Sequence, residues 1–192
     1  MKQFAIVILL LLCASCIQIG GEPARINYYL LQSFQEEQYP YSSDTLTIDI
    51  KLIGFPQYLD RNQIVTHGQD SRIRVATSEN WAEPLRDNLL RILRKDMSLL
   101  LPKAHITLSP WEESQHNALK IDLLINDFSG RLAKETIVDI NWTIRKNEQI
   151  FDQGRFYADQ PIGDSYSDLA SGLSQSIEKL SRALAKKLIT IR

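Results

Sequence analysis

The chain has 192 residues and nearly balanced charge, with 22 Lys and Arg residues against 23 Asp and Glu residues. It contains no block of basic residues, so the composition argues against a protein that binds nucleic acid. The length is suited to a single domain with a substantial apolar core.

The N-terminus has the features of a secretory signal, with a basic start, an apolar run at residues 4–12 and small residues before Cys16. The run is shorter than the roughly 20 apolar residues that cross a bilayer. Cys16 follows Ala14 and Ser15, which resembles a lipobox, where the thiol takes a diacylglycerol and the new amino group takes an acyl chain such as palmitate. We therefore predict a signal peptide at residues 1–15 and lipidation at Cys16; the alternative is a plain signal peptide with a chance cysteine.

The residue after the predicted lipid acceptor is Ile17. Lipoproteins kept in the inner membrane usually carry Asp there, so we expect the periplasmic face of the outer membrane of a Gram-negative cell. Residues 16–25 form the lipidated cysteine and a short tether, and residues 26–192 form one domain. Both cysteines precede that domain, so we expect no disulfide and no cysteine-bound metal in it.

The first half of the domain has the pattern of strands. We predict strands at residues 26–33, 46–53, 63–67 and 72–76. In the second of these, apolar and polar residues alternate, as in a strand with one buried face.

A helix is predicted at residues 82–101, with Asn80 as its cap, Glu83 at capping-box spacing and Pro84 in the first turn. Pro102 ends it. Its leucines, isoleucine and methionine recur at helical spacing and form one apolar stripe.

The second half of the domain follows the same order of strands and then a helix. A short strand at residues 105–108 precedes three long strands at 118–128, 136–145 and 149–158, whose short links indicate antiparallel pairing. A final helix at residues 165–189 begins at Ser165, with Asp168 at capping-box spacing. The predicted fold class is α/β, with a mixed sheet and two long amphipathic helices.

The sequence offers no motif for catalysis. The three histidines have no second ligand at the close spacing of zinc sites, and there is no nucleophile elbow, Walker A motif or dinucleotide fingerprint. We therefore predict no enzyme activity, no catalytic residue, no metal and no cofactor. Two alternatives stay open, a lipid-anchored periplasmic hydrolase with a spatially assembled site and a domain that carries lipid itself.

Two local motifs are candidates for contact with a partner. One is a Pro-initiated corner at residues 55–65, and the other lies at residues 81–85, just before a helix. An Asp–Arg pair and a tyrosine are suited to an interface, but the same residues can instead pack a corner. The candidate partner-binding residues are Tyr58, Leu59, Asp60, Arg61, Gln63, Trp81 and Glu83.

These motifs also carry a family resemblance. The lipobox cysteine followed by Pro23 and residues 28–31, and the motifs at 56–65 and 81–85, resemble the ABC-type transport auxiliary lipoproteins. The resemblance implies a three-layer α/β/α domain with a mixed sheet and a non-enzymatic role. It also implies a partner with mammalian cell entry (MCE) domains in an envelope system that transports phospholipid. Because such partners form rings, a ring-shaped homo-oligomer is expected here as well.

Overall fold

The computed structural model describes residues 25–35, 41, 45–68, 70–113 and 117–191. The predicted signal peptide, Cys16 and all of the tether except Arg25 lie outside these residues.

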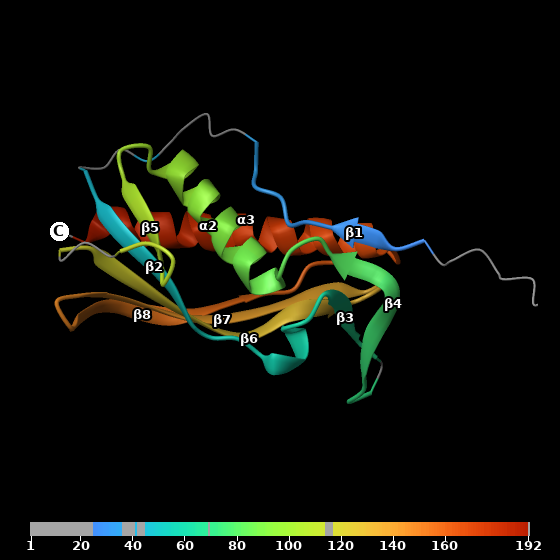
Figure 1. Ribbon diagram of the computed structural model, residues 1–192. Coiled ribbons are helices and arrows are strands. Elements are labelled where there is room, and N and C mark those ends of the chain that lie inside the picture. The colour runs from blue at the N-terminus through green and yellow to red at the C-terminus, as the bar shows by residue number, and fades with distance from the viewer. Residues whose placement is uncertain (1–24, 36–40, 42–44, 69, 114–116, 192) are drawn as a thin grey trace, which may run out of the picture.

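The larger sheet has five strands in the order β5-β2-β6-β7-β8 (Figure 1). Its central strands β2, β6 and β7 are flanked by β5 and β8 at the two edges. Strand β2 is parallel to both of its neighbours, whereas the β6–β7 and β7–β8 pairs are antiparallel, so the sheet is mixed. The bounds are β2 Thr47–Gly54, β5 His105–Ser109, β6 Leu119–Arg131, β7 Glu135–Lys146 and β8 Gln149–Ala158.

A second, three-stranded sheet has the order β1-β4-β3. The short β1, Asn27–Tyr29, is parallel to β4, Ile73–Trp81, and β4 is antiparallel to β3, Gln63–His67. A single turn of 3-10 helix, η2, Gln57–Leu59, lies between β2 and β3. This small sheet and the start of α3 lie at one end of the molecule, where the described chain begins (Figure 1).

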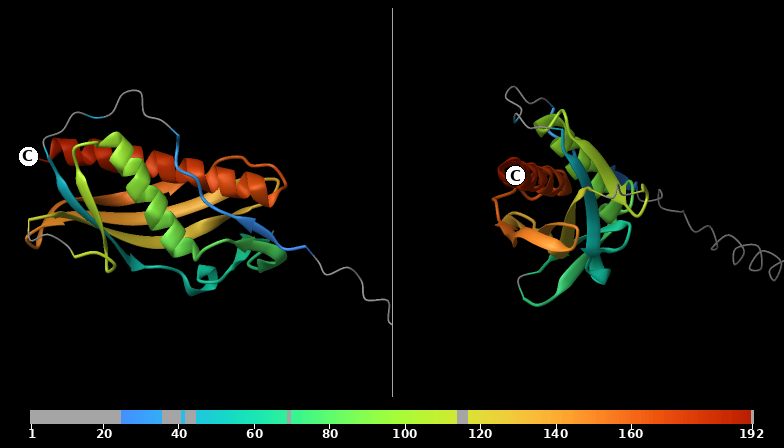
Figure 2. Two further views of the ribbon diagram at one scale, coloured as in Figure 1. Left: turned by 45° about the horizontal axis from the view of Figure 1, so that its top comes forward. Right: turned by 90° about the vertical axis from the view of Figure 1, so that its left-hand side faces the viewer.

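The two helices are α2, Leu85–Leu100, and α3, Tyr166–Thr190. They contact each other, and Figures 1 and 2 place both on the same face of the five-stranded sheet. The apolar stripe of α3 packs onto the buried side chains of β6 and β7, where Ile121 pairs with Ile144 and Leu123 with Trp142. The apolar stripe of α2 packs onto β5 and β2. Burial of these aliphatic side chains, each stabilising by roughly 1.5–3 kcal/mol, makes this interface the core of the fold.

The predicted α/β class, with mixed sheets and two long amphipathic helices, is confirmed. Within that class the helices share one face of the large sheet instead of covering both faces. The reason lies in the strand patterns: β7 buries every second residue and leaves the alternate residues half-exposed, so only one of its faces is apolar.

Some element ends differ from the prediction. The strand expected at residues 26–33 ends at Tyr29, and the helix expected from residue 82 begins at Leu85. Asn80 does not cap that helix, because β4 continues through Asn80 to Trp81 and pairs with β3. The capping box of Ser165 and Asp168 at the start of α3 is confirmed.

Candidate functional site

The corner after β2 divides the first motif into packed and exposed residues. Leu59 is only 2% exposed and belongs to the core, whereas Asp60, Arg61 and Gln63 are exposed. The turn is closed by backbone hydrogen bonds from Leu59 N–H to Pro56 (3.0 Å) and from Arg61 N–H to Leu59 (2.9 Å). Two charged side chains and one amide therefore project from a backbone that is fixed by its own turn.

Tyr58 braces this corner against the large sheet. Its ring makes a T-shaped contact with the His67 ring, with ring centroids 6.3 Å apart. Burial raises the pKa of Tyr58 above its usual value, and Asp127 adds to this effect. Asp127 is in turn 3.0 Å from His67 Nε2 and accepts a hydrogen bond from Ser129 Oγ at 2.6 Å. Tyr58 thus stays protonated and belongs to a polar cluster between η2, β3 and β6.

The second motif is structural and meets the first. Trp81 is 4% exposed, and its backbone N–H donates to the carbonyl of Asn62 at 2.7 Å. Glu83 accepts hydrogen bonds from Asn88 and Arg91. Trp81 therefore belongs to the core, and Glu83 is paired with side chains of α2. Of the seven candidates, Asp60, Arg61 and Gln63 are the exposed ones.

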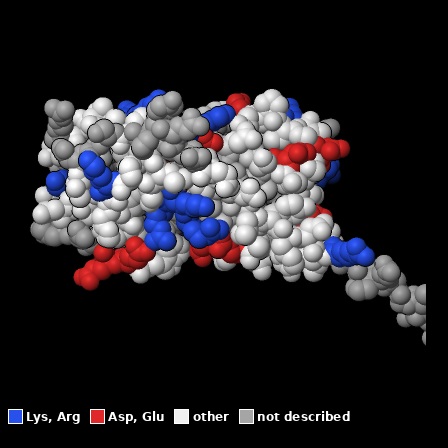
Figure 3. All heavy atoms as spheres, turned by 90° about the horizontal axis from the view of Figure 1, so that it is seen from above, with Lys and Arg blue, Asp and Glu red and all other residues white. Residues whose placement is uncertain are grey.

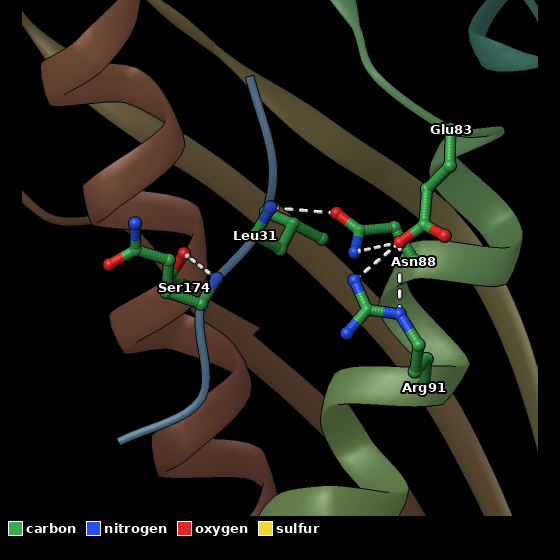
Figure 4. Close-up of polar contacts among 6 residues, drawn as sticks. Leu31, Glu83, Asn88, Arg91 and Ser174 are labelled. Carbon is green, nitrogen blue, oxygen red and sulfur yellow. Dashed lines mark hydrogen bonds and ion pairs between the residues drawn. The ribbon is translucent and has the colours of Figure 1, made fainter. Parts of the chain in front are cut away.

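Glu83 acts on the N-terminal segment through Asn88. From Leu30 the chain leaves β1 and crosses the pair of helices (Figure 4). There the N–H of Leu31 donates to Asn88 Oδ1 at 2.7 Å, and the N–H of Gln32 donates to Ser174 Oγ at 3.0 Å. We call residues 30–34 the strap. Within the described part of the chain the strap belongs to no strand. Side chains of α2 and α3 instead accept hydrogen bonds from two of its N–H groups.

Asp96 of α2 is fully buried under the strap. Ser181 Oγ lies 3.3 Å from Asp96 Oδ2, and burial raises the pKa of Asp96 to about 6, against the opposing effect of hydrogen bonding by Ser33 and Ser181. Asn88, Asp96 and Ser174 were not among the residues predicted from the sequence. The feature that could have indicated them is a polar residue at a position where the apolar stripe of a helix predicts a buried residue.

The cluster around Asp127 contains Ser, His and Asp but lacks the geometry of a hydrolase triad. A nucleophilic serine needs its hydroxyl on the histidine. Here both Ser129 and His67 bond to Asp127, and Ser129 is 1% exposed. No cluster of three or more His, Cys, Asp or Glu that could hold a metal occurs among the described residues.

Charges on the helical side of the molecule are largely paired. Figure 3 shows Lys and Arg gathered near the middle of this side with Asp and Glu beside them. On α2, Arg91 pairs with Glu83, and Arg94 with Glu112. Exposed pairs of this kind contribute little to stability, and they leave little unbalanced charge for a ligand.

Comparisons with known proteins agree with the fold. A family model described as "ABC-type transport auxiliary lipoprotein component" matches residues 28–185. Two relatives, from Escherichia coli K12 and Shigella flexneri, are both named "Intermembrane transport lipoprotein PqiC"; each is 23% identical over 189 residues, covering 98% of both chains.

Two solved structures share the architecture. The crystal structure of an uncharacterized protein has a TM-score of 0.72 at 19% identity, covering 85% of this chain and 99% of its own. A protein from Xanthomonas campestris has a TM-score of 0.66 at 14% identity, covering 87% and 95%. Among the described residues, no helix is both long and apolar enough to cross a membrane.

Proposed function

The chain belongs to the ABC-type transport auxiliary lipoprotein family, and from this premise we propose that it is a non-enzymatic docking subunit of an envelope lipid-transport system. Its relatives named for intermembrane transport support the transport role. In this proposal Cys16 carries the lipid anchor at the periplasmic face of the outer membrane, and the partner is an MCE-domain protein.

The anchor keeps the domain close to the membrane. Nine residues separate Cys16 from Ile26, and an extended tether of that length reaches about 30 Å. The strap then fixes the chain to both helices through Asn88 and Ser174. A force that the partner exerts on the domain would therefore be transmitted through the helices and the strap to the anchor, as an adaptor requires.

The observation that carries the docking role is the exposed corner at Asp60, Arg61 and Gln63. Its charges stand on a turn that Leu59 anchors in the core and Tyr58 braces against Asp127. Among the described residues, neither Asp60 nor Arg61 has a side-chain hydrogen bond or ion pair to another residue. Preorganised, unpaired charges of opposite sign favour a specific polar contact with a partner.

Co-purification tests this assignment. The lipidated protein is extracted with a mild detergent from native envelopes, and its partners are identified by mass spectrometry. We expect an MCE-domain protein with the parent chain and at least a tenfold lower yield with Arg61→Glu. The matched control is Arg72→Glu, an exposed arginine in the turn between β3 and β4. Equal yields from the two variants would remove Arg61 from the interface, and the absence of any envelope partner would remove the docking role.

The other two readings receive less support. Ser129 is buried and bonded to Asp127, which disfavours the hydrolase. The space between the helices and the sheet is filled by the protein's own apolar side chains, which disfavours carriage of lipid inside the core. The ring-shaped homo-oligomer remains part of the proposal, and light scattering of the detergent-extracted protein would determine its size.

A further inference from the structure

A cationic cavity lies at the end of the molecule where the described chain begins. It has a volume of about 350 Å³ and is formed by the end of β3, the start of β4, the β6–β7 turn and the first residue of α3. Its polar lining comprises Thr66, His67, Arg74, Arg131, Lys134 and Tyr166. The volume falls in the range of small-molecule pockets.

The lining has three permanent cations and no carboxylate. Glu135, just outside it, binds Arg131 Nη1 at 2.6 Å and lies 3.8 Å from Lys134 Nζ. Arg74 has no ion-pair partner within the described part of the chain, and the Lys134 side chain is 64% exposed. Three further carboxylates border the cavity: Asp127 bonds to His67, and Glu79 and Asp70 interact electrostatically with Tyr166 and Arg74. None of these carboxylates belongs to the lining, so the cations form the wall that a ligand would contact.

Neutral hydrogen-bond donors accompany these cations. Burial raises the pKa of the Tyr166 hydroxyl, and the charge of Glu79 adds to this effect, so the group is protonated at neutral pH. Thr66 and Gly68 contribute further to the wall. Arginine, lysine and hydroxyl donors converging on one hollow match the acceptor oxygens of a phosphate group.

The cavity is close to the point where the tether joins the domain. Glu79 of β4 accepts hydrogen bonds from Tyr29 Oη (2.6 Å) and Asn27 of β1, and it acts electrostatically on Tyr166 in the cavity wall. Exposed apolar side chains extend along the same entry segment: Ile26 is 52% exposed, Tyr28 64% and Leu30 44%. An aromatic and two aliphatic side chains beside a basic pocket resemble the composition of membrane-interface segments.

We propose that this cavity binds the phosphate group of an anionic phospholipid from the membrane that holds the anchor. The phosphate would lie between Arg74 and Lys134, with Tyr166 as a neutral hydrogen-bond donor. Ile26 and Tyr28 would contact the membrane where the headgroups meet the acyl chains. The lipid source rests on the proposed anchor at Cys16. The affinity for a phosphate group rests on the cavity alone, so it can be tested when the docking role fails.

Thermal unfolding of the full lipidated chain in mild detergent provides the test, because a ligand that binds only the folded state raises Tm. The probes are glycerol 3-phosphate, short-chain phosphatidylglycerol and short-chain phosphatidylcholine, at matched ionic strength. We expect Tm to rise with the first two, and most with phosphatidylglycerol. The variant Arg74→Gln/Lys134→Gln should lose at least tenfold in affinity.

The control is Arg86→Gln/Lys103→Gln, which removes two exposed cations elsewhere and should keep the affinity. If the double variant melts below the parent without ligand, Lys134→Gln alone replaces it. The proposal is overturned if Tm rises with neither glycerol 3-phosphate nor phosphatidylglycerol. It is also overturned if the rise survives the loss of Arg74 and Lys134. Binding of glycerol phosphate without any preference for phosphatidylglycerol over phosphatidylcholine overturns the lipid source.

Discussion

At the scale of single residues, three buried polar side chains hold the strap. Asn88, Asp96 and Ser174 occupy positions on α2 and α3 where an apolar residue would be expected from helical spacing alone. Each faces residues 31–34. Burying a polar side chain without a hydrogen-bond partner lowers the stability of the fold. We therefore interpret these three residues as the ones that hold the strap.

Asn88→Ala should destabilise the domain by about 2 kcal/mol, because it leaves the Leu31 N–H buried without an acceptor. The free energy of unfolding is measured by urea denaturation. Asn117→Ala, at an exposed position, is the control and should be nearly neutral. Similar small losses from both variants would show that the strap is not held by Asn88.

Asp96 should make stability depend on pH in the direction opposite to most carboxylates. Its pKa is raised from 3.8 to about 6 in the folded chain, so its contribution is greatest below about pH 4 and is lost as pH rises through 6, by about 3 kcal/mol in total. The Asp96→Asn variant should therefore gain stability over the parent as pH rises from about 4 to about 7.5.

Urea denaturation at both pH values measures this difference, and comparison with the parent cancels the contributions of other carboxylates. Asp159→Asn, an exposed substitution, should show no such gain. If the stability of Asp96→Asn parallels that of the parent across this range, Asp96 does not titrate as its burial implies.

At the scale of elements, the sequence predicted the bounds of a strand or helix best where its local pattern agrees with its pairing in the sheet. The bounds of β3 and β8 coincide with the predicted residues 63–67 and 149–158, because turn-forming residues flank both strands. The start of α2 was predicted wrongly because Asn80 has the chemistry of a cap. Its backbone instead pairs with Gln63, and tertiary pairing overrides a local preference.

The capping box of α3 gives an element-scale prediction. Ser165 Oγ accepts the N–H of Asp168 at 3.0 Å, so Ser165→Ala should cost about 1 kcal/mol of unfolding free energy. Ser167→Ala, an exposed position in the same first turn, should cost much less. Because Tyr166 lines the cationic cavity, phosphate binding by Ser165→Ala should weaken as well. Equal costs for the two variants would contradict the role of the cap.

At the scale of the whole molecule, the two family motifs meet each other, and the second motif also supports the strap through α2. The N–H of Trp81 binds Asn62, Glu83 orients Asn88, and Asn88 holds the strap. The sequence could indicate the family and the α/β class, since both depend on patterns along the chain. It could not separate packed from exposed motif residues, nor reveal the cationic cavity, because these depend on contacts between segments far apart in the chain.

The central claim is that the corner at Arg61 meets a transport partner while the rest of the motif holds the fold. A photo-cross-linking amino acid placed at position 61 in cells, with products identified by mass spectrometry, tests it most directly. We predict a cross-link to an MCE-domain protein from position 61 and none from position 72. No cross-link from position 61, or equal products from both positions, would contradict the account.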